Sequence, residues 1–330
     1  MAKQAFRPFN IRRTDRKIQL VKVLEVIKKH QEAGIERVTS RQLYYRLVAA
    51  GVIPNNARSY QNLTTLLTDA RYMGLVDWDF IVDLGREPII PNQFHNLKHL
   101  AEVAVASLKY DRWAGQSNYV EVWVEKQALQ SVLEPIGNEL HIPIVVNKGY
   151  TSASSMYRSA TRLRTAERRG KTPHVIYCGD LDPSGEDMVR DISDRLTEFG
   201  VQDAQITKLA LLLSHVEEHE CPVNPAKTTD SRFQGYADQI QSDPGYARVV
   251  EAQGLDAADV YSWELDALPV EVLDNMVREA VEQLIDDPDH VEEVKDKERR
   301  DKAHLLKAVQ KIMDGTFNDD DDDDDDGDAR

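Results

Sequence analysis

Residues 175–187 read VIYCGDLDPSGED, an apolar run that ends in a glycine and is followed by Asp180 and Asp182. Such a run is typical of a buried β-strand, and the Pro-Ser-Gly sequence after the acids is typical of a turn that leads into a helix. Side chains alternate in extended backbone, so the two carboxylates are expected on the same side, just past the end of the strand. Glu125 follows the strand-like segment NYVEVWV, residues 118–124, in the same way.

The segments around this stretch predict the fold class. From residue 119 onward, strand-like and helix-like segments alternate, which predicts an α/β fold with a mostly parallel sheet and helices on its faces. The four expected strands are NYVEVWV, IPIVVN, HVIYC and ITKLALLL. In such sheets ligands bind at the carboxyl ends of the strands, which is where the three acids fall. After about residue 215 the chain is expected to be helical and acidic.

A different order of elements is expected at the start of the chain. Three helix-like segments come first, and each ends in a glycine that suits a left-handed helix cap. Their ranges are 18–34, 40–51 and 59–74. Residues 75–90 then read as two short strands around a turn. Three helices followed by a small hairpin are the order of a winged helix, which often docks on DNA, although protein-binding modules share this order.

Length and composition predict a globular chain in the cytoplasm. With 330 residues, of which 41% are hydrophobic and 30% charged, the chain can bury a sizeable core and form two domains. No apolar run approaches the roughly 20 residues that span a bilayer, and the amino terminus lacks the apolar core of a signal peptide, so no membrane partner is expected. Only two cysteines occur, which argues against a disulfide framework or a Cys-based zinc site.

The charge is unevenly distributed. The net charge is -16, but the aspartate-rich residues 315–330 hold nine Asp and one Arg, half of the excess. Residues 1–17 carry six Lys or Arg against one Asp, and residues 158–171 carry six against one Glu. We expect these basic stretches to contact the DNA backbone without reading its sequence. The candidate arginines are Arg12, Arg13, Arg158, Arg162 and Arg169. A solvated helix face is an equally simple interpretation of any one of them.

The three carboxylates favour a metal site. Glu125, Asp180 and Asp182 would repel one another at neighbouring strand ends unless a positive charge lay between them. A donor set made only of oxygen indicates Mg²⁺ or Mn²⁺. The alternative is that Asp180 and Asp182 form a helix cap and an Asx turn, and spacing leaves both interpretations open.

The ordered combination of short motifs resembles a known family. VEKQAL, NKGY and GDLDPSGED resemble the Toprim domain, and together with RQLYY upstream and PAKTTDSR and WELDAL downstream they are similar to the A subunit of topoisomerase VI and its meiotic double-strand-break relatives. The similarity is greatest to the short, stand-alone "Mini-A" forms and spans about residues 35–285. It implies a winged-helix DNA-binding domain followed by a Toprim-type parallel-sheet α/β domain.

The resemblance, together with the charge distribution, implies this organisation of the chain. The expected parts are a basic N-terminal arm (1–17), a winged-helix domain (18–91), a linker (92–117), a Toprim-like domain with a helical C-terminal extension (118–317) and a disordered acidic tail (318–330). The resemblance also implies that Glu125, Asp180 and Asp182 bind magnesium and that Tyr45 forms a 5'-phosphotyrosyl bond with DNA. In the family the tyrosine of one subunit meets the metal site of the other, so a homodimer is expected to cut both strands. No ATPase motif occurs in this chain, so either a separate ATP-binding B-type subunit or another partner exists, or the protein only binds, bends, nicks or cuts DNA.

Helical periodicity separates the two tyrosines of RQLYY. Leu43, Tyr44 and Leu47 share an apolar face, so Tyr44 is expected in the core and Tyr45 off that face, exposed, on the side of Arg41. A phenol with a pKa of about 10 is a poor nucleophile at neutral pH unless a cation lowers its pKa or a base takes its proton. Arg41 is the candidate cation. A merely wetted tyrosine is the alternative interpretation of Tyr45.

The sequence therefore predicts double-stranded DNA as the partner and metal-assisted tyrosyl transfer as the reaction. Two alternatives stay open. One is a Toprim nuclease that uses activated water, and the other is a DNA-binding or architectural protein without catalysis.

Overall fold

The computed structural model describes residues 6, 8–33, 35, 38–77, 80–82, 93–147 and 153–313. The chain forms two compact units: a larger unit, Met1–Arg86 with Gln116–Asp286, and a smaller unit, Glu87–Gly115 with Asp287–Arg330. Over the described ranges there are twelve α-helices and a parallel four-stranded sheet, so the predicted mixed α/β class is confirmed.

The central sheet of the larger unit follows the predicted strand pattern. Its strands lie in the order β4-β3-β5-β6, and every neighbouring pair is parallel. Their bounds are β3 (Asn118–Val124), β4 (Ile144–Val146), β5 (Thr172–Cys178) and β6 (Gln205–Ala210). The carboxyl ends of β3 and β5 are in register, since Val124 pairs with Cys178.

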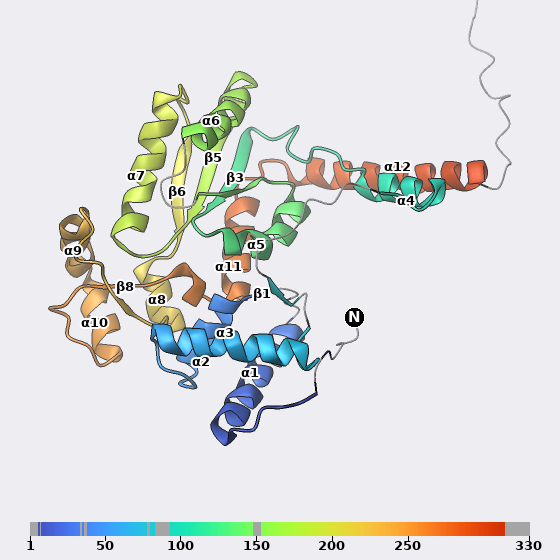
Figure 1. Ribbon diagram of the computed structural model, residues 1–330. Helices are drawn as coiled ribbons and strands as arrows, with labels where there is room; N and C mark the ends of the chain where they lie inside the picture. The colour runs from blue at the N-terminus through green and yellow to red at the C-terminus, as the bar shows by residue number, and fades with distance from the viewer. Residues whose placement is uncertain are drawn as a thin grey trace, which may run out of the picture. The chain divides into compact units, whose positions relative to one another are not determined.

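Helices cover both faces of this sheet (Figure 1). On one face α6 (Ala153–Arg168) and α7 (Pro183–Glu198) pack on the strands, and Trp123, Tyr177 and Met188 lie in the core between them. On the other face lie α5 (Gln127–Leu140) and α11 (Val270–Glu282). A parallel sheet buried on both faces explains why the strands read as nearly continuous apolar runs.

The three N-terminal helices also match the sequence pattern. They are α1 (Thr14–Glu32), α2 (Ser40–Ala49) and α3 (Ala57–Tyr72). Gly51 and Gly74 follow α2 and α3 with φ of 65° and 70°, a conformation that glycine adopts without steric cost. The N-terminus of α2 is fixed by a capping box in which the Thr39 side chain and the Gln42 side chain bond each other's backbone N–H groups.

The expected hairpin at residues 75–90 is described only in part. Residues 81 and 82 form β2 (Ile81–Val82), which pairs in parallel with β1 (Val38–Thr39) ahead of α2. The second expected strand falls on residues 83–90, outside the described residues.

A helical segment after the sheet completes the larger unit. Its elements are α8 (Leu213–His219), β7 (Asn224–Pro225), α9 (Phe233–Ser242), α10 (Pro244–Ala252), β8 (Tyr261–Ser262) and the 3-10 helix η1 (Leu265–Ala267). Strands β7 and β8 pair antiparallel, and η1 packs against α2. This last contact brings the C-terminal part of the unit onto the N-terminal helices.

The smaller unit is a pair of packed helices. Helix α4 (Leu97–Ser107) lies along α12 (Pro288–Met313). Tyr110 ties the segment after α4 to α12, because its backbone N–H donates to Glu298 at 3.1 Å and its hydroxyl donates to Asp301 at 2.7 Å.

The units group the chain differently from the domains expected from the sequence. Residues assigned to the winged helix and to the Toprim-like domain fall in one unit, whereas the expected linker contains α4 and shares a unit with α12. The expected boundaries stay predictions, since a compact unit is not always a domain. The acidic tail, 318–330, lies outside the described residues.

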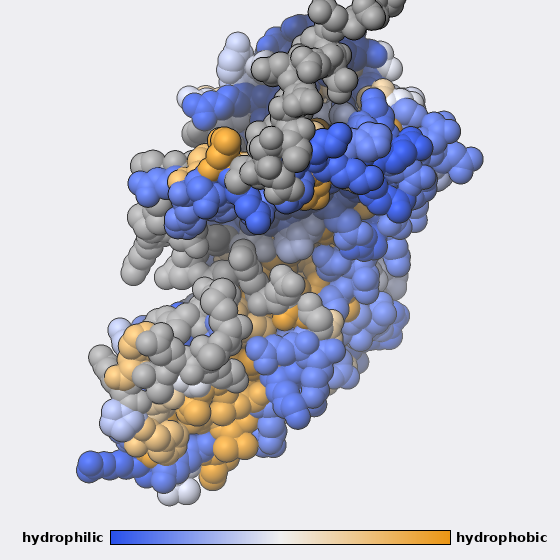
Figure 2. Space-filling view, turned by 90° about the vertical axis from the view of Figure 1, so that its right-hand side faces the viewer, coloured by the Kyte–Doolittle hydropathy of each residue, from blue (hydrophilic) through white to orange (hydrophobic). Residues whose placement is uncertain are grey.

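The surface carries exposed apolar side chains on and before α1. They are Phe6, Phe9, Ile18 and Val21. Figure 2 shows apolar surface at the level of α1. Over the part of the chain that the structure describes, no helix combines the length and the apolarity needed to cross a membrane.

Candidate functional site

The ends of β3 and β5 place two of the predicted acids together. Glu125 follows β3, and its Oε2 accepts a hydrogen bond from the backbone N–H of Asp180 at 2.9 Å. The Tyr177 hydroxyl donates to the same oxygen at 3.4 Å. Two glycines make this tight turn possible, because a Cβ at Gly179 would lie 2.1 Å from the Tyr177 hydroxyl and one at Gly185 would lie 2.1 Å from the Asp180 carbonyl.

Asp182 caps the helix that follows. Its Oδ1 accepts the backbone N–H of Gly185 at 2.7 Å and the hydroxyl of Ser184 at 2.9 Å, which makes it the N-cap of α7. The capping interpretation of the sequence therefore describes Asp182. This bond directs Oδ1 of Asp182 toward the helix.

A backbone bridge brings two further acids to the site. Leu181 and Trp263 exchange backbone hydrogen bonds of 2.9 Å in both directions. As a result Glu264, Leu265 and Asp266 lie beside Asp180, and the Leu265 N–H donates to Asp180 Oδ1 at 2.8 Å. Sequence reasoning gave no role to Glu264 or Asp266, although both belong to the WELDAL motif.

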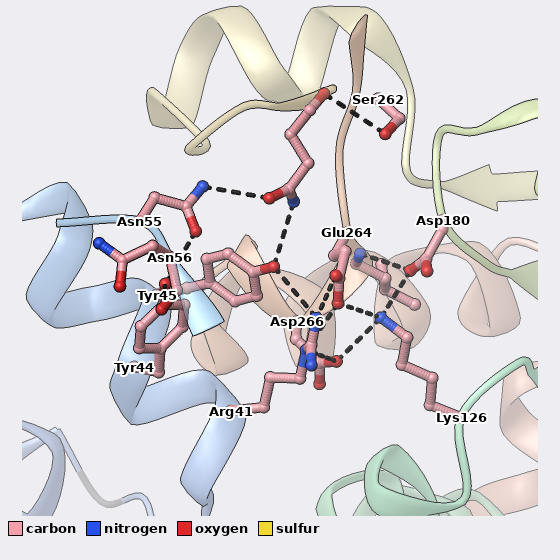
Figure 3. A network of polar contacts seen from close by, with 12 residues as sticks. Arg41, Tyr44, Tyr45, Asn55, Asn56, Lys126, Asp180, Ser262, Glu264 and Asp266 are labelled. Atoms are coloured by element: carbon pink, nitrogen blue, oxygen red, sulfur yellow. Dashed lines mark hydrogen bonds and ion pairs between the residues drawn. The ribbon is translucent and has the colours of Figure 1, made fainter. Parts of the chain in front are cut away.

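A lysine lies at the centre of these acids. Lys126 Nζ is 2.9 Å from Asp180 Oδ1, 2.9 Å from Glu264 Oε2 and 3.0 Å from Asp266 Oδ2 (Figure 3). Arg41 joins the group through its ion pair with Glu264, with Nε 2.6 Å from Oε2. We call Arg41, Lys126, Asp180, Glu264 and Asp266 the Lys126 cluster. Lys126 was also missed, although it follows Glu125 directly in the VEKQAL motif.

The charges of the Lys126 cluster are not balanced. Three carboxylates face one ammonium and one guanidinium. Asp266 is 2% exposed, and neither of its carboxylate oxygens has a hydrogen-bond partner among the described residues, although Oδ2 forms the ion pair with Lys126. Burial raises the pKa of Asp180, while the Lys126 ammonium acts in the opposite direction. Burial alone would lower the pKa of Lys126, but the surrounding carboxylates raise it well above its usual value.

Tyr45 borders this cluster, and the expectation that it is exposed was wrong. Its side chain is 1% exposed, whereas Tyr44 lies in the core as predicted. Helix periodicity predicts only which face of α2 packs on its neighbouring helices. Tyr45 is buried instead by a segment far away in the sequence. Asn224, in β7, donates to the Tyr45 hydroxyl at 3.2 Å.

Arg41 lies on the same side of α2 as Tyr45, as the helical spacing predicts. Its Nη2 is 3.4 Å from the Tyr45 hydroxyl, and its guanidinium lies 5.6 Å from the centre of the Tyr45 ring. Burial raises the pKa of Tyr45 to about 12; the Glu264 carboxylate adds to this effect, and Arg41 opposes it without reversing it. The phenol is therefore protonated at neutral pH in this arrangement.

A polar groove opens beside the cluster. It has a volume of about 460 Å³. Its lining includes the hydroxyl side chains Ser40, Thr64 and Thr68 together with Arg41, Lys126 and Asp266. Hydroxyls and cations that face one groove suit the oxygen atoms of a phosphate group.

The predicted DNA-contacting arginines are in different situations. Arg12, Arg158 and Arg169 are exposed, and Arg13 is exposed but paired with Asp15 at 2.6 Å. Arg162 is half-buried, and its guanidinium is engaged by buried Glu121, with Nε 2.7 Å from Oε1 and Nη2 2.9 Å from Oε2. The Arg162 side chain thus has a structural partner that the spacing of basic residues did not reveal.

The chemistry of the site fits an oxygen-binding cation such as Mg²⁺. The donors are carboxylates, one of them has an unsatisfied buried oxygen, and an ammonium already lies among them. In the described ranges no three His, Cys, Asp or Glu side chains are grouped as a metal ion requires. No protein-family model matches the sequence, and no curated protein matches it at a significant level.

Proposed function

We propose that this chain cleaves duplex DNA by tyrosyl transfer, in the manner of the topoisomerase VI A subunit that its motifs resemble. The observation that carries the proposal is one connected network. The Tyr45 hydroxyl contacts Arg41, Arg41 pairs with Glu264, and Lys126 links Glu264 to Asp180 at the end of β5. The proposed nucleophile, the cations for a phosphate and the strand-end acids are thus connected within one chain, whereas in the family that the motifs resemble the tyrosine of one subunit meets the acids of the other, so in the proposed homodimer this network has to open.

The finer fold assignment belongs to the same proposal. Helices α1–α3 with β1 and β2 are interpreted as a winged helix, and the parallel sheet with its strand-end acids is interpreted as a Toprim domain. Double-stranded DNA is the proposed substrate. A homodimer, and an ATP-binding B-type or other partner subunit, are the proposed assembly, with a place on the nucleoid in the cytoplasm.

The reaction follows from the residues. The Tyr45 phenol loses its proton to solvent, and its oxygen attacks the scissile phosphorus. The new bond joins the tyrosine oxygen to the 5' phosphate, and the bond from phosphorus to the 3' oxygen breaks, leaving a 3' hydroxyl once that oxygen takes up a proton. Arg41 neutralises the phosphate oxygens as charge develops on them. Because Arg41 is paired with Glu264 and Tyr45 is buried, DNA binding has to open this arrangement first.

The strand-end acids supply the metal part of the site. Glu125 and Asp180 would hold Mg²⁺ or Mn²⁺, with Asp182 beside them through the oxygen that does not cap α7. When bound, the ion would stabilise negative charge on the phosphate and on the leaving oxygen.

Cleavage trapped with SDS tests the proposal. Supercoiled plasmid is incubated with Mg²⁺ or Mn²⁺ and analysed with and without protease digestion, using wild type, Tyr45→Phe, Asp180→Ala and the matched control Tyr44→Phe. We expect protein-linked breaks in wild type and Tyr44→Phe and none in the other two variants. Protein-linked breaks in Tyr45→Phe would overturn the role of Tyr45.

A metal-dependent nuclease that uses water is the second candidate. The observation in its favour is the buried Tyr45 hydroxyl, whose pKa of about 12 disfavours a phenolate at neutral pH. In the same assay this candidate predicts protein-free breaks that survive Tyr45→Phe and require Asp180. The absence of any break would favour a DNA-binding protein without catalysis.

A further inference from the structure

Lys126 occupies the position that a cation would take among three acids. It lies between Glu125, at the end of β3, and the start of α5. An ammonium has three N–H donors: Lys126 Nζ donates to Glu264 Oε2 at 2.9 Å and forms ion pairs with Asp180 at 2.9 Å and with Asp266 at 3.0 Å. Figure 3 shows the side chain reaching into the middle of these carboxylates.

The charge of the Lys126 cluster favours a doubly charged occupant. Lys126 and Arg41 leave one of the three negative charges uncompensated, and Asp266 is almost completely buried, with neither carboxylate oxygen hydrogen-bonded among the described residues. Exchanging an ammonium for a divalent cation adds the missing positive charge. Such an exchange stabilises a buried group of acids far more than an exposed group, because solvent screens little inside the protein.

Both cations cannot be present together. The carboxylate oxygens lie 2.9–3.0 Å from the ammonium nitrogen, whereas Mg²⁺ requires ligand oxygens at about 2.1 Å. The acids can close around a metal ion only after the ammonium leaves.

The groove beside the cluster gives the ammonium a place to go. Lys126 lines it together with Arg41 and the hydroxyl side chains of Thr64 and Thr68. A lysine that moves into this groove keeps polar neighbours, and it gains an anionic partner whenever a phosphate group lies there.

We propose that Lys126 is a built-in competitor of the divalent cation: its ammonium occupies the site formed by Asp180, Glu264 and Asp266 and has to withdraw before the metal ion enters. The inference rests on the metal site of the proposed function and adds Glu264 and Asp266 to its donors. Its consequence is a low apparent metal affinity, since binding must overcome the population in which the ammonium fills the site.

The first test uses the wild-type chain. An amine-reactive acylating reagent is applied at increasing Mn²⁺ concentration, and the acylation of each lysine is measured by mass spectrometry. We expect the acylation rate of Lys126 to rise severalfold as Mn²⁺ binds, because the ammonium leaves its carboxylates. Lys208 is the matched control, since it is also buried and paired, with Glu186 and the Asp180 carbonyl rather than with the three acids, and its rate should stay constant. An unchanged Lys126 rate at saturating Mn²⁺ would overturn the proposal.

The second test measures Mn²⁺ affinity by calorimetry in wild type, Lys126→Met and Lys208→Met. We expect Lys126→Met to bind Mn²⁺ about tenfold more tightly or better, and Lys208→Met to bind like wild type. Equal affinity in Lys126→Met and wild type would refute the competition and leave the metal site of the proposed function intact. If neither protein bound Mn²⁺ at millimolar concentration, the metal site and the competition would both be refuted.

Discussion

Two clusters of charged side chains lie in the larger unit, one around Glu121 and one around Lys126. In the first, Glu121 is fully buried in β3 and accepts hydrogen bonds from the Tyr119 hydroxyl at 2.8 Å, from Trp123 Nε1 at 2.9 Å and from both sides of the Arg162 guanidinium. One carboxylate meets one guanidinium, and each carboxylate oxygen has two donors. We call these four residues the Glu121 cluster.

The Lys126 cluster is partly buried, but its charges and hydrogen-bonding groups are not all matched by partners. Its three carboxylates share one ammonium and one guanidinium, and both carboxylate oxygens of Asp266 are without a hydrogen-bond partner among the described residues. A closed and balanced network fixes a structure, whereas an open and unbalanced one leaves capacity for a ligand. The contrast therefore supports the Lys126 cluster as the proposed site and the Glu121 cluster as part of the framework.

The largest expected effect separates the two clusters by activity. Asp180→Asn removes a negative charge from the proposed metal site, so the proposed DNA cleavage should fall by on the order of 10³-fold or more. Glu121→Gln keeps the shape of the framework, and we expect the cleavage rate per folded molecule to stay within about threefold of wild type, since Glu121 contacts no reacting group. Single-turnover cleavage of supercoiled plasmid measures both variants. A similar loss in both would erase the distinction between the clusters.

The next effect concerns stability. Glu121→Ala leaves Arg162 as an unpaired, half-buried charge and removes the acceptor of the Tyr119 and Trp123 donors, so the free energy of unfolding should fall by about 3–5 kcal/mol. Urea denaturation followed by circular dichroism measures the loss. Arg162→Ala should cost a similar amount, and the double variant should cost less than the two single losses combined. Additive losses would show that the two side chains do not act as a pair.

A charge-neutralising change in the Lys126 cluster should cost far less. Asp266→Asn weakens an ion pair with Lys126 but also removes the excess negative charge, so we expect the free energy of unfolding to change by less than about 1 kcal/mol in either direction. The same urea denaturation checks this value. A loss as large as that of Glu121→Ala would mean that the Lys126 cluster is framework too.

The pH dependence of cleavage sharpens the role of Tyr45. Burial raises the pKa of this phenol to about 12, so folding favours its neutral form; that stabilisation is complete below the ordinary tyrosine pKa of about 10 and is lost as pH rises through 12. If the phenolate attacks, its fraction grows about tenfold per pH unit below 10, and the single-turnover rate should rise with that slope from about pH 7 to 9.5. A flat rate over this range would show that Tyr45 is not the titrating nucleophile.

The smallest effect concerns the exposed arginines of α6. Arg158→Ala should weaken binding to duplex DNA of any sequence and reduce the slope of log affinity against log salt by about one unit. Arg162→Ala should change this slope less, since its guanidinium is already held by Glu121. Fluorescence anisotropy at several salt concentrations measures both slopes. Equal changes in the two slopes would mean that ion pairing with Glu121 does not withhold Arg162 from DNA.

Local patterns in the sequence predicted much of the fold. The four strands of the sheet and the three N-terminal helices appeared as apolar runs and as a 3.6-residue period, because their own residues form the buried faces. The neighbourhood of Glu125 and Asp180 was also predictable, since parallel strands that pair in register end at the same edge. Glycines that end helices marked two helix boundaries correctly.

The residues that complete the site were not predictable in this way. Glu264 and Asp266 reach Asp180 only through the pairing of Leu181 with Trp263, and Tyr45 is covered by Asn224, so no local period contains these contacts. The sequence did contain a signal for the buried ion pair of the framework. Glu121 interrupts the apolar segment NYVEVWV, and a charged residue inside a buried strand requires a partner of opposite charge, here Arg162.

The pairing of Leu181 with Trp263 also determines when the site can form during synthesis of the chain. Tyr45, Glu125 and Asp180 leave the ribosome early, but the backbone N–H that holds Asp180 belongs to Leu265, 85 residues later. A nascent chain that ends before Trp263 holds the proposed nucleophile and the strand-end acids without the segment that joins them. The proposed DNA-cleaving arrangement is therefore delayed until nearly all of the larger unit has been translated.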